Sequence, residues 1–217
     1  MLRFVASVLI TSGILMLADA GLTLGWQEPV SAFFAAQEQS RLGHELDSTA
    51  DIVAREKLLV ASIRNTRRRL ARLGELERKR ARPGRPIGRI KLPTLGRKYV
   101  VVQGTSLDTL RKGPGHYPRT RFPGERGTVA IAGHRTTYGA PFRTINKLKR
   151  GDHVVLAMPY GTFTYAVKRT QIVRPDAIWI IRRVPGRDRL VLSACHPLYS
   201  ASHRIVAFAR LISERPA

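Results

Sequence analysis

The sequence predicts an all-β domain, folded as a barrel or a sandwich, that follows a transmembrane helix and a helical stalk. The sheet is predicted by seven short runs of β-type residues in about the last 130 residues, most of them bounded by Gly, Pro, Asp or Arg. The first helix is predicted by an apolar run near the N-terminus. The stalk is predicted by a stretch rich in helix formers that lacks strand alternation.

The apolar run extends from Phe4 to Trp26, 23 residues that include a single charge, Asp19. As a helix it would be roughly 35 Å long, and the hydrocarbon core of a bilayer is ~30 Å thick. Arg3 precedes the run, and little positive charge follows it, so we expect a cytoplasmic N-terminus and an exported body. Residues 1–30 are therefore predicted to form a cytoplasmic tip and a single-pass membrane anchor, with membrane contact through residues 4–26.

A cleaved signal peptide is the alternative, because Ala18-Asp19-Ala20 fits a small-x-small cleavage pattern. The apolar run continues through Leu22, Leu24 and Trp26, which is longer than a typical signal core and favours the uncleaved anchor. Both interpretations place the rest of the chain outside the cytoplasm.

Residues 31–86 are predicted to form the helical stalk and a linker. An a/d-like apolar stripe suggests a stalk with some capacity to self-associate; its members are Ile52, Leu59, Ile63, Leu70 and Leu73. The alternative is an amphipathic helix that lies on the neighbouring domain or on lipid. Pro83-Gly84-Arg85-Pro86 breaks any helix and is typical of a linker, so the compact domain is expected at 87–217.

The predicted strands lie at Tyr99–Val102, Thr128–Ala132, His153–Met158, Thr162–Val167, Ala177–Ile181, Leu190–Ala194 and Ile205–Leu211. Pro159-Tyr160-Gly161 is predicted to form the turn of a hairpin. A short helix is expected at Ser106–Lys112, with Ser106 as its N-cap and Gly113 as its stop.

Composition restricts the function classes. The 217 residues are 43% apolar, which excludes disorder over the whole length, and the single cysteine, Cys195, excludes an intrachain disulfide and a zinc site built on several thiolates. Residues 87–217 hold 24 basic and 6 acidic residues, a net charge of +18, which would attract nucleic acid, anionic lipid or anionic wall polymers. Nucleic acid is not expected, because no recognition motif is visible and the domain is predicted to be exported.

Three chemically active residues stand at the ends of predicted strands. His134 follows the run that ends at Gly133, Cys195 follows the run that ends at Ala194, and Arg204 opens the next run. If the last two runs pair antiparallel, Cys195 and Arg204 lie at the same end of the sheet, where His134 could join them. A thiolate nucleophile, an imidazole and a guanidinium form a minimal acyl-transfer set. This spacing alone is a weak signal, because a lone cysteine is more often a small buried apolar residue.

The local sequences add a resemblance. Residues 128–142, TVAIAGHRTTYGAPF, together with Leu192-Ser193-Ala194-Cys195-His196-Pro197, Arg204 and the upstream segment Gly113–Pro118, resemble the sortase family. The similarity is closest to class E of Gram-positive actinobacteria, with class D next, and it covers about residues 87–217. It implies a closed barrel of about eight strands with short helices.

The resemblance also implies roles. Cys195 would be the nucleophile, His134 the general acid/base, and Arg204 the group that stabilises the oxyanion. Two family threonines are replaced here, by Val191 and Ala194. The predicted substrate-binding residues are Thr136, Thr137, Tyr138 and Ala194. No cofactor and no metal ion are expected.

The predicted function is therefore that of a membrane-anchored cysteine transpeptidase. It would cleave a C-terminal Leu-x-x-Thr-Gly-type sorting signal between Thr and Gly through a thioester. It would then join the protein to an amine of a peptidoglycan precursor or a pilin. The alternative from another class is a non-catalytic, cationic exported module that binds the wall or another polyanion without using Cys195.

Overall fold

The computed structural model describes the backbone of residues 1–25 and 29–217; the side chains of residues 2, 19, 20 and 22–30 lie outside the described part. The helices are α1 (Leu2–Gly25), α2 (Pro29–Asp47), α3 (Ala50–Leu59), α4 (Thr66–Arg80) and α5 (Leu107–Lys112). The strands are β1 (Pro86–Leu92), β2 (Arg97–Gln103), β3 (Gly115–His116), β4 (Thr128–Ala132), β5 (His153–Met158), β6 (Gly161–Val173), β7 (Arg189–His196) and β8 (His203–Pro216).

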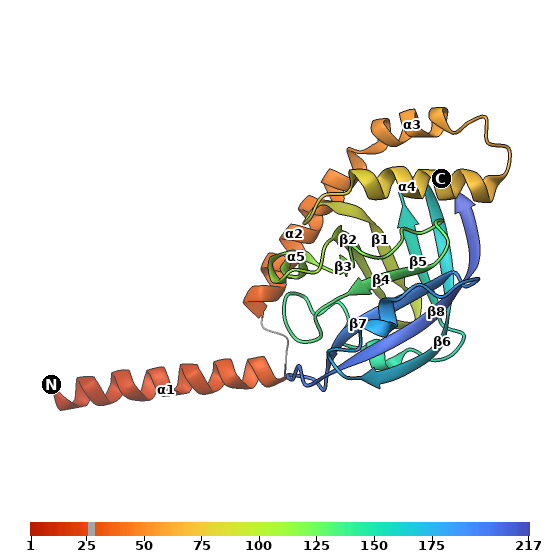
Figure 1. The fold of residues 1–217 in the computed structure, drawn as a ribbon. Coiled ribbons are helices and arrows are strands. Elements are labelled where there is room, and N and C mark those ends of the chain that lie inside the picture. The colour runs from red at the N-terminus through yellow and green to blue at the C-terminus, as the bar shows by residue number, and fades with distance from the viewer. Residues whose placement is uncertain (26–28) are drawn as a thin grey trace.

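The strands form one closed barrel in the order β1-β2-β3-β4-β7-β8-β6-β5 (Figure 1). The pairs β2–β3 and β4–β7 are parallel, and all the other pairs are antiparallel. Because the barrel is closed, the sheet has no free edge, and the alternative of a β-sandwich is excluded. The prediction of an all-β closed barrel of eight strands with short helices is confirmed.

Local sequence determines several elements directly. β4 and β5 have the predicted bounds, and Met158 pairs with Gly161 across the predicted hairpin turn. Helix α5 begins after Ser106, whose hydroxyl accepts a hydrogen bond from the backbone of Thr109, as predicted for an N-cap.

One strand assignment was wrong, and two strands were not predicted. Ala177–Ile181 is not a strand; a 3-10 helix occupies Ile178–Ile181 in the loop between β6 and β7, and Ile180 packs against the outside of the barrel. Pro175 lies just before this segment and cannot donate to a β-ladder, which explains the difference. Conversely, β1 and the two-residue strand β3 were not predicted.

The helices before the barrel do not form a separate stalk. Leu70 and Leu73 of α4 and Val53 of α3 belong to the same buried cluster as the barrel interior. Figure 1 shows α4 lying across one end of the barrel and α2 lying along the strands β1 and β2. The stalk prediction is therefore corrected, and the alternative of a helix lying on the neighbouring domain holds. The physical reason is that the apolar stripe finds a buried partner within its own chain.

Specific polar contacts hold these helices in place. The side chain of Gln39 in α2 accepts a hydrogen bond from the backbone N–H of Val100 and donates to the Val100 carbonyl, at 2.6 and 3.1 Å. It thereby pairs part of β2 that β3 does not reach. In α4, Arg78 forms an ion pair with Glu125 at 2.9 Å. The Pro83–Pro86 segment is a short turn rather than a long linker, since the Gly84 N–H donates to the carbonyl of Gln103 at 2.7 Å.

The N-terminal segment forms α1, a helix of 24 residues that projects away from the barrel in Figure 1. Among the residues that the structure describes, no helix meets the length and apolarity required to cross a bilayer. Residues 26–28, at the end of the predicted span, and the side chains of Asp19, Leu22 and Leu24 lie outside the described part. The anchor therefore stays a prediction.

Candidate functional site

Two of the predicted catalytic residues lie on paired strands, and His134 lies two residues beyond the neighbouring strand β4. Cys195 in β7 pairs directly with Arg204 in β8. On the other side of β7, Ala132 of β4 pairs with Ser193, and the Gly133 N–H donates to the Ser193 carbonyl at 3.0 Å. Continuing this parallel register sets His134 beside Cys195. The backbone thus brings all three residues to the same end of the sheet.

Alternation along the strands places this site on the outer face of the barrel. In β7, Leu190, Leu192 and Ala194 belong to the core cluster of the barrel interior, whereas Val191 belongs to a second cluster on the outside. Cys195 continues the outward series of Val191 and Ser193. Val206 in β8 also packs in the outer cluster, so Arg204 faces outward with Cys195.

The Cys195 thiol is free and partly exposed, which a nucleophile requires. Cys195 is the penultimate residue of β7, and the ladder with β8 fixes its backbone. The thiol is therefore presented from a rigid strand rather than from a mobile loop.

His134 is partly buried, and its ring lies 5.2 Å from the ring of Tyr138. Burial lowers the pKa of His134 below the usual value, and the nearby positive charge of Arg111 lowers it further. Its Nε2 atom is buried and has no hydrogen-bond partner among the described residues. A neutral imidazole with an unengaged nitrogen is suited to take and return a proton during catalysis.

The loop after His134 is tightly shaped. Tyr138, Gly139 and Ala140 all have positive φ angles, of 52°, 72° and 39°, and two of the three are not glycine. The loop returns to its start, because the Phe142 N–H donates to the His134 carbonyl at 3.0 Å. The backbone on both sides of His134 is thus fixed.

The Arg204 side chain does not form its hydrogen bonds with Cys195 but with backbone carbonyls near the start of β8. Its Nη1 donates to the carbonyls of Ala201 and His203, at 2.9 and 3.0 Å. In the part of the chain that the structure describes, no side-chain hydrogen bond joins the Arg204 guanidinium to Cys195. The register brings the two residues together, but the guanidinium is turned toward the loop between β7 and β8.

Arg135 is a residue of this site that the sequence did not single out. It is only 5% exposed, and its guanidinium donates to the Cys195 carbonyl at 3.3 Å and to His196 Nδ1 at 3.2 Å. It also donates to Asn146 Oδ1 at 3.0 Å and to the Arg143 carbonyl at 3.3 Å. Burial, followed by the charge of Arg143, holds the pKa of Arg135 below its usual range. Arg135 therefore ties the end of β7 to the segment that follows His134.

The predicted substrate residues fall into two groups. Thr136, Thr137 and Tyr138 lie in the loop beside His134 and are partly exposed, so they can reach a ligand on the outer face. Ala194 is 3% exposed and packs inside the barrel, so its side chain points away from that face. The prediction that Ala194 contacts substrate does not fit, because neighbouring strand residues face opposite sides.

Among the described residues, no group of three or more His, Cys, Asp or Glu side chains could hold a metal ion. The groups that the backbone brings to this end of the sheet include a thiol, an imidazole and two guanidinium groups. Such a set can transfer an acyl group through a covalent intermediate.

Comparison with known proteins agrees with this geometry. The family model described as Sortase domain matches residues 90–212. Sortase D of Bacillus subtilis is 36% identical over 114 residues, which cover 52% of this chain and 56% of that protein. Sortase SrtE1 of Streptomyces coelicolor is 30% identical over 149 residues, covering 62% of this chain and 42% of the relative. The chain thus spans about half the length of these relatives.

Solved structures show the same fold. Sortase E from Streptomyces avermitilis has a TM-score of 0.57 and 36% identity, covering 62% of this chain and 93% of that one. Sortase E1 from Streptomyces coelicolor, solved with a tripeptide in its active site, has a TM-score of 0.58 and 27% identity, covering 63% and 93%. With the family model matched over more than half of its length, this chain belongs to the sortase family.

Proposed function

We propose that this protein is an exported, membrane-anchored cysteine transpeptidase that uses Cys195, His134 and Arg204. The observation that supports the proposal is the pairing of Cys195 with Arg204, together with the register of β4 and β7, which leads from Ala132 and Ser193 toward His134 and Cys195. Membership of the family adds support, because sortases are cysteine transpeptidases.

In the first half of the reaction, His134 takes the proton of the Cys195 thiol, and the resulting thiolate attacks the threonine carbonyl of a Leu-x-x-Thr-Gly-type signal. A carbon–sulfur bond forms, and the threonine–glycine bond breaks. His134 gives its proton to the departing glycine amine, which leaves the acyl group on sulfur as a thioester. Arg204 stabilises the intermediate oxyanion once its guanidinium turns from the Ala201 and His203 carbonyls toward the reacting carbon.

In the second half, an amine attacks the thioester carbonyl. His134 accepts a proton from this amine, the new amide bond forms, and Cys195 leaves as the thiolate, which then takes the proton back from His134. We propose that the amine belongs to a peptidoglycan precursor or a pilin. Because the pKa of His134 is lowered, the imidazole tends to be neutral between turnovers and can act as this base.

The substrate lies, in this proposal, on the outer face beside the His134 loop. Thr136, Thr137 and Tyr138 are the candidate contacts, and the Tyr138 ring lies tilted beside the imidazole, with 5.2 Å between the ring centres. The tripeptide in the active site of the Streptomyces coelicolor relative supports a peptide as the substrate of this chain.

The location is proposed from the sequence. The run Phe4–Trp26 is long enough to span a bilayer, and the charge distribution around it favours a cytoplasmic N-terminus. The catalytic domain would then face the cell exterior, where surface proteins and wall precursors meet.

The test uses the full chain in a mild detergent with a labelled Leu-x-x-Thr-Gly peptide and an amine. We expect a mass-spectrometric adduct on Cys195 and an amide product, both absent from Cys195→Ala. The absence of an adduct with every variant of the peptide would refute the proposal. A non-catalytic polyanion-binding module predicts instead that Cys195→Ala retains full biological function.

A further inference from the structure

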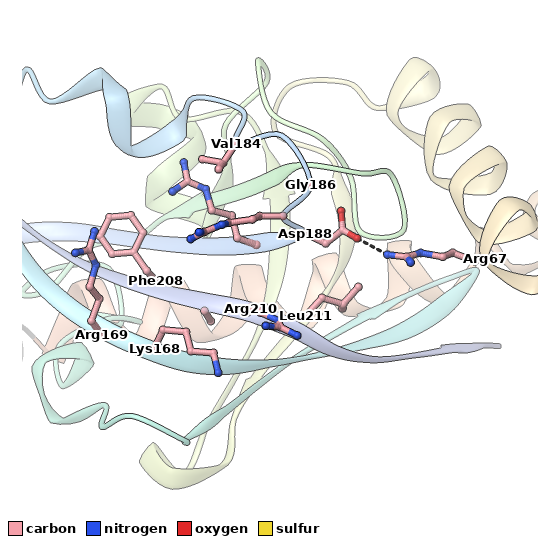
Figure 2. Close-up of a pocket in the computed structure, with 12 residues that line it drawn as sticks. Arg67, Lys168, Arg169, Val184, Gly186, Asp188, Phe208, Arg210 and Leu211 are labelled. Atoms are coloured by element: carbon pink, nitrogen blue, oxygen red, sulfur yellow. Dashed lines mark hydrogen bonds and ion pairs between the residues drawn. The ribbon is translucent and has the colours of Figure 1, made fainter.

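A second concave surface lies on the outer face of β6, β7 and β8, away from Cys195 (Figure 2). It encloses about 880 Å³. Six of its lining residues are cationic: Arg67, Lys168, Arg169, Arg187, Arg189 and Arg210.

The sheet register explains why these cations converge. Arg189 in β7 pairs with Arg210 in β8, and Arg169 in β6 pairs with Phe208. The β6–β8 register shifts between Val167 and Arg169, which marks a β-bulge around Lys168. Because a bulge re-aims side chains, two consecutive cations, Lys168 and Arg169, line the same pocket.

Most of this charge lacks an acidic partner. Asp188 is the single acidic residue among those that line the pocket, and Arg67 and the Gly127 N–H already engage it. Within the described part of the chain, no carboxylate oxygen lies within 4 Å of the charged nitrogens of the other five cations. Burial, together with the like charges of Arg169 and Arg187, lowers the pKa of Arg189. The cations therefore repel one another, and a bound anion would relieve that repulsion.

The Phe208 ring contacts two of these cationic side chains. The Arg169 guanidinium lies 4.9 Å from the centre of the Phe208 ring, and that of Arg189 lies 5.8 Å from it. Figure 2 shows Arg169 beside Phe208, and Trp179 stacks on the same ring at 6.0 Å. Arg189 is fixed further by hydrogen bonds to Thr128 Oγ1 and to the Ile180 carbonyl. These contacts preorganise the charges before any ligand binds.

We propose that this pocket binds an anion carrying two or more neighbouring phosphate groups, such as a pyrophosphate or a phosphodiester chain. Guanidinium groups bind phosphate oxygens bidentately, and they form most of this cationic lining. The volume exceeds that of a single small ion, and the concave shape fits a discrete ligand better than a flat membrane surface.

The site is separate from the catalytic residues but shares their face. Arg189 and Cys195 lie on the same strand, six residues apart and in the same outward series. At ~3.3 Å per residue, the two positions are about 20 Å apart. A phosphate ligand and a peptide can therefore occupy the outer face at the same time.

The test measures binding to the full chain in non-ionic detergent by calorimetry, at low salt, with inorganic pyrophosphate and with a short poly(glycerol phosphate). Trp179 provides a second readout by fluorescence in a Trp26→Phe background, since the sequence has only two tryptophans. We expect saturable binding of at least one of these probes at one site per chain. The preferred probe distinguishes a pyrophosphate from a phosphodiester source.

Two triple variants remove the same number of charges. Lys168→Gln/Arg169→Gln/Arg210→Gln should weaken binding about tenfold or more, whereas Lys91→Gln/Lys98→Gln/Arg150→Gln, at exposed positions elsewhere, should change it less than about twofold. Equal weakening by both variants, equal binding of a polyglutamate of matched charge, or no saturable binding would overturn the proposal. Cys195→Ala should bind normally, so this test is independent of transpeptidation.

Discussion

Replacing Arg135 by Met tests whether the buried guanidinium positions the nucleophile. The change keeps a long side chain but removes donors to the Cys195 carbonyl, His196, Asn146 and the Arg143 carbonyl. Each hydrogen bond from a charged donor contributes about 1.5–3 kcal/mol, so four give roughly 6–12 kcal/mol. Removing a buried charge returns several kcal/mol of desolvation energy. The expected net loss of unfolding free energy is therefore about 2–4 kcal/mol.

Thermal unfolding should show this loss as a decrease of Tm by about 5–15 °C, because 1 kcal/mol corresponds to ~2–4 °C in a chain of this size. In assays below the transition, kcat/KM for transpeptidation should fall more than about tenfold, mainly through kcat, since the Cys195 backbone loses its support. Arg150→Met, at an exposed position, is the control and should change neither value. An Arg135→Met enzyme with normal kcat would refute the positioning role, whatever its stability.

Three further changes have defined outcomes. A Cβ on Gly133 would lie 2.7 Å from the Phe142 ring. Gly133→Ala should therefore reduce kcat and lower the free energy of unfolding, measured by urea titration, by about 1–3 kcal/mol. Unchanged values of both would show that the ring moves freely. Arg111→Gln removes a charge that lowers the pKa of His134, so the acidic limb of kcat/KM at low salt should shift to higher pH; a downward shift would contradict this electrostatic effect. The pKa of Glu56 is raised to about 7, chiefly by burial, so the folded state favours the protonated form of this carboxyl. The free energy of unfolding therefore decreases as the pH rises from 4.5 through 7. Glu56→Gln should therefore raise Tm at pH 8 and leave it nearly unchanged at pH 4, and the reverse pattern would count against a raised pKa.

The sequence predicted the all-β domain and the pairing of Cys195 with Arg204 because both depend on local signals. β4 and β5 are apolar runs closed by turn residues, and their predicted bounds are the observed ones. The pairing of Cys195 with Arg204 follows from the short connection between two consecutive strands.

The features that the sequence did not predict depend on tertiary contacts. Ala177–Ile181 has the composition of a strand, but its apolar side chains cover the outside of the barrel instead of joining the ladder. Arg135 is one of 38 basic residues, and only the folded loop shows that its guanidinium is buried. The stripe on α4 is compatible with either self-association or intramolecular packing, because periodicity does not specify the partner.

The position of α4 has a practical consequence for defining the minimal folding unit. The family match begins at residue 90, yet Leu70 and Leu73 are 0% and 3% exposed and complete the barrel interior. Burying two leucines contributes about 3–6 kcal/mol, a large part of the ~5–15 kcal/mol that stabilises a typical domain. A truncated protein that starts at residue 87 would open one end of the barrel to water, so a soluble fragment for crystallography or assay should begin before Asn65, the N-cap of α4.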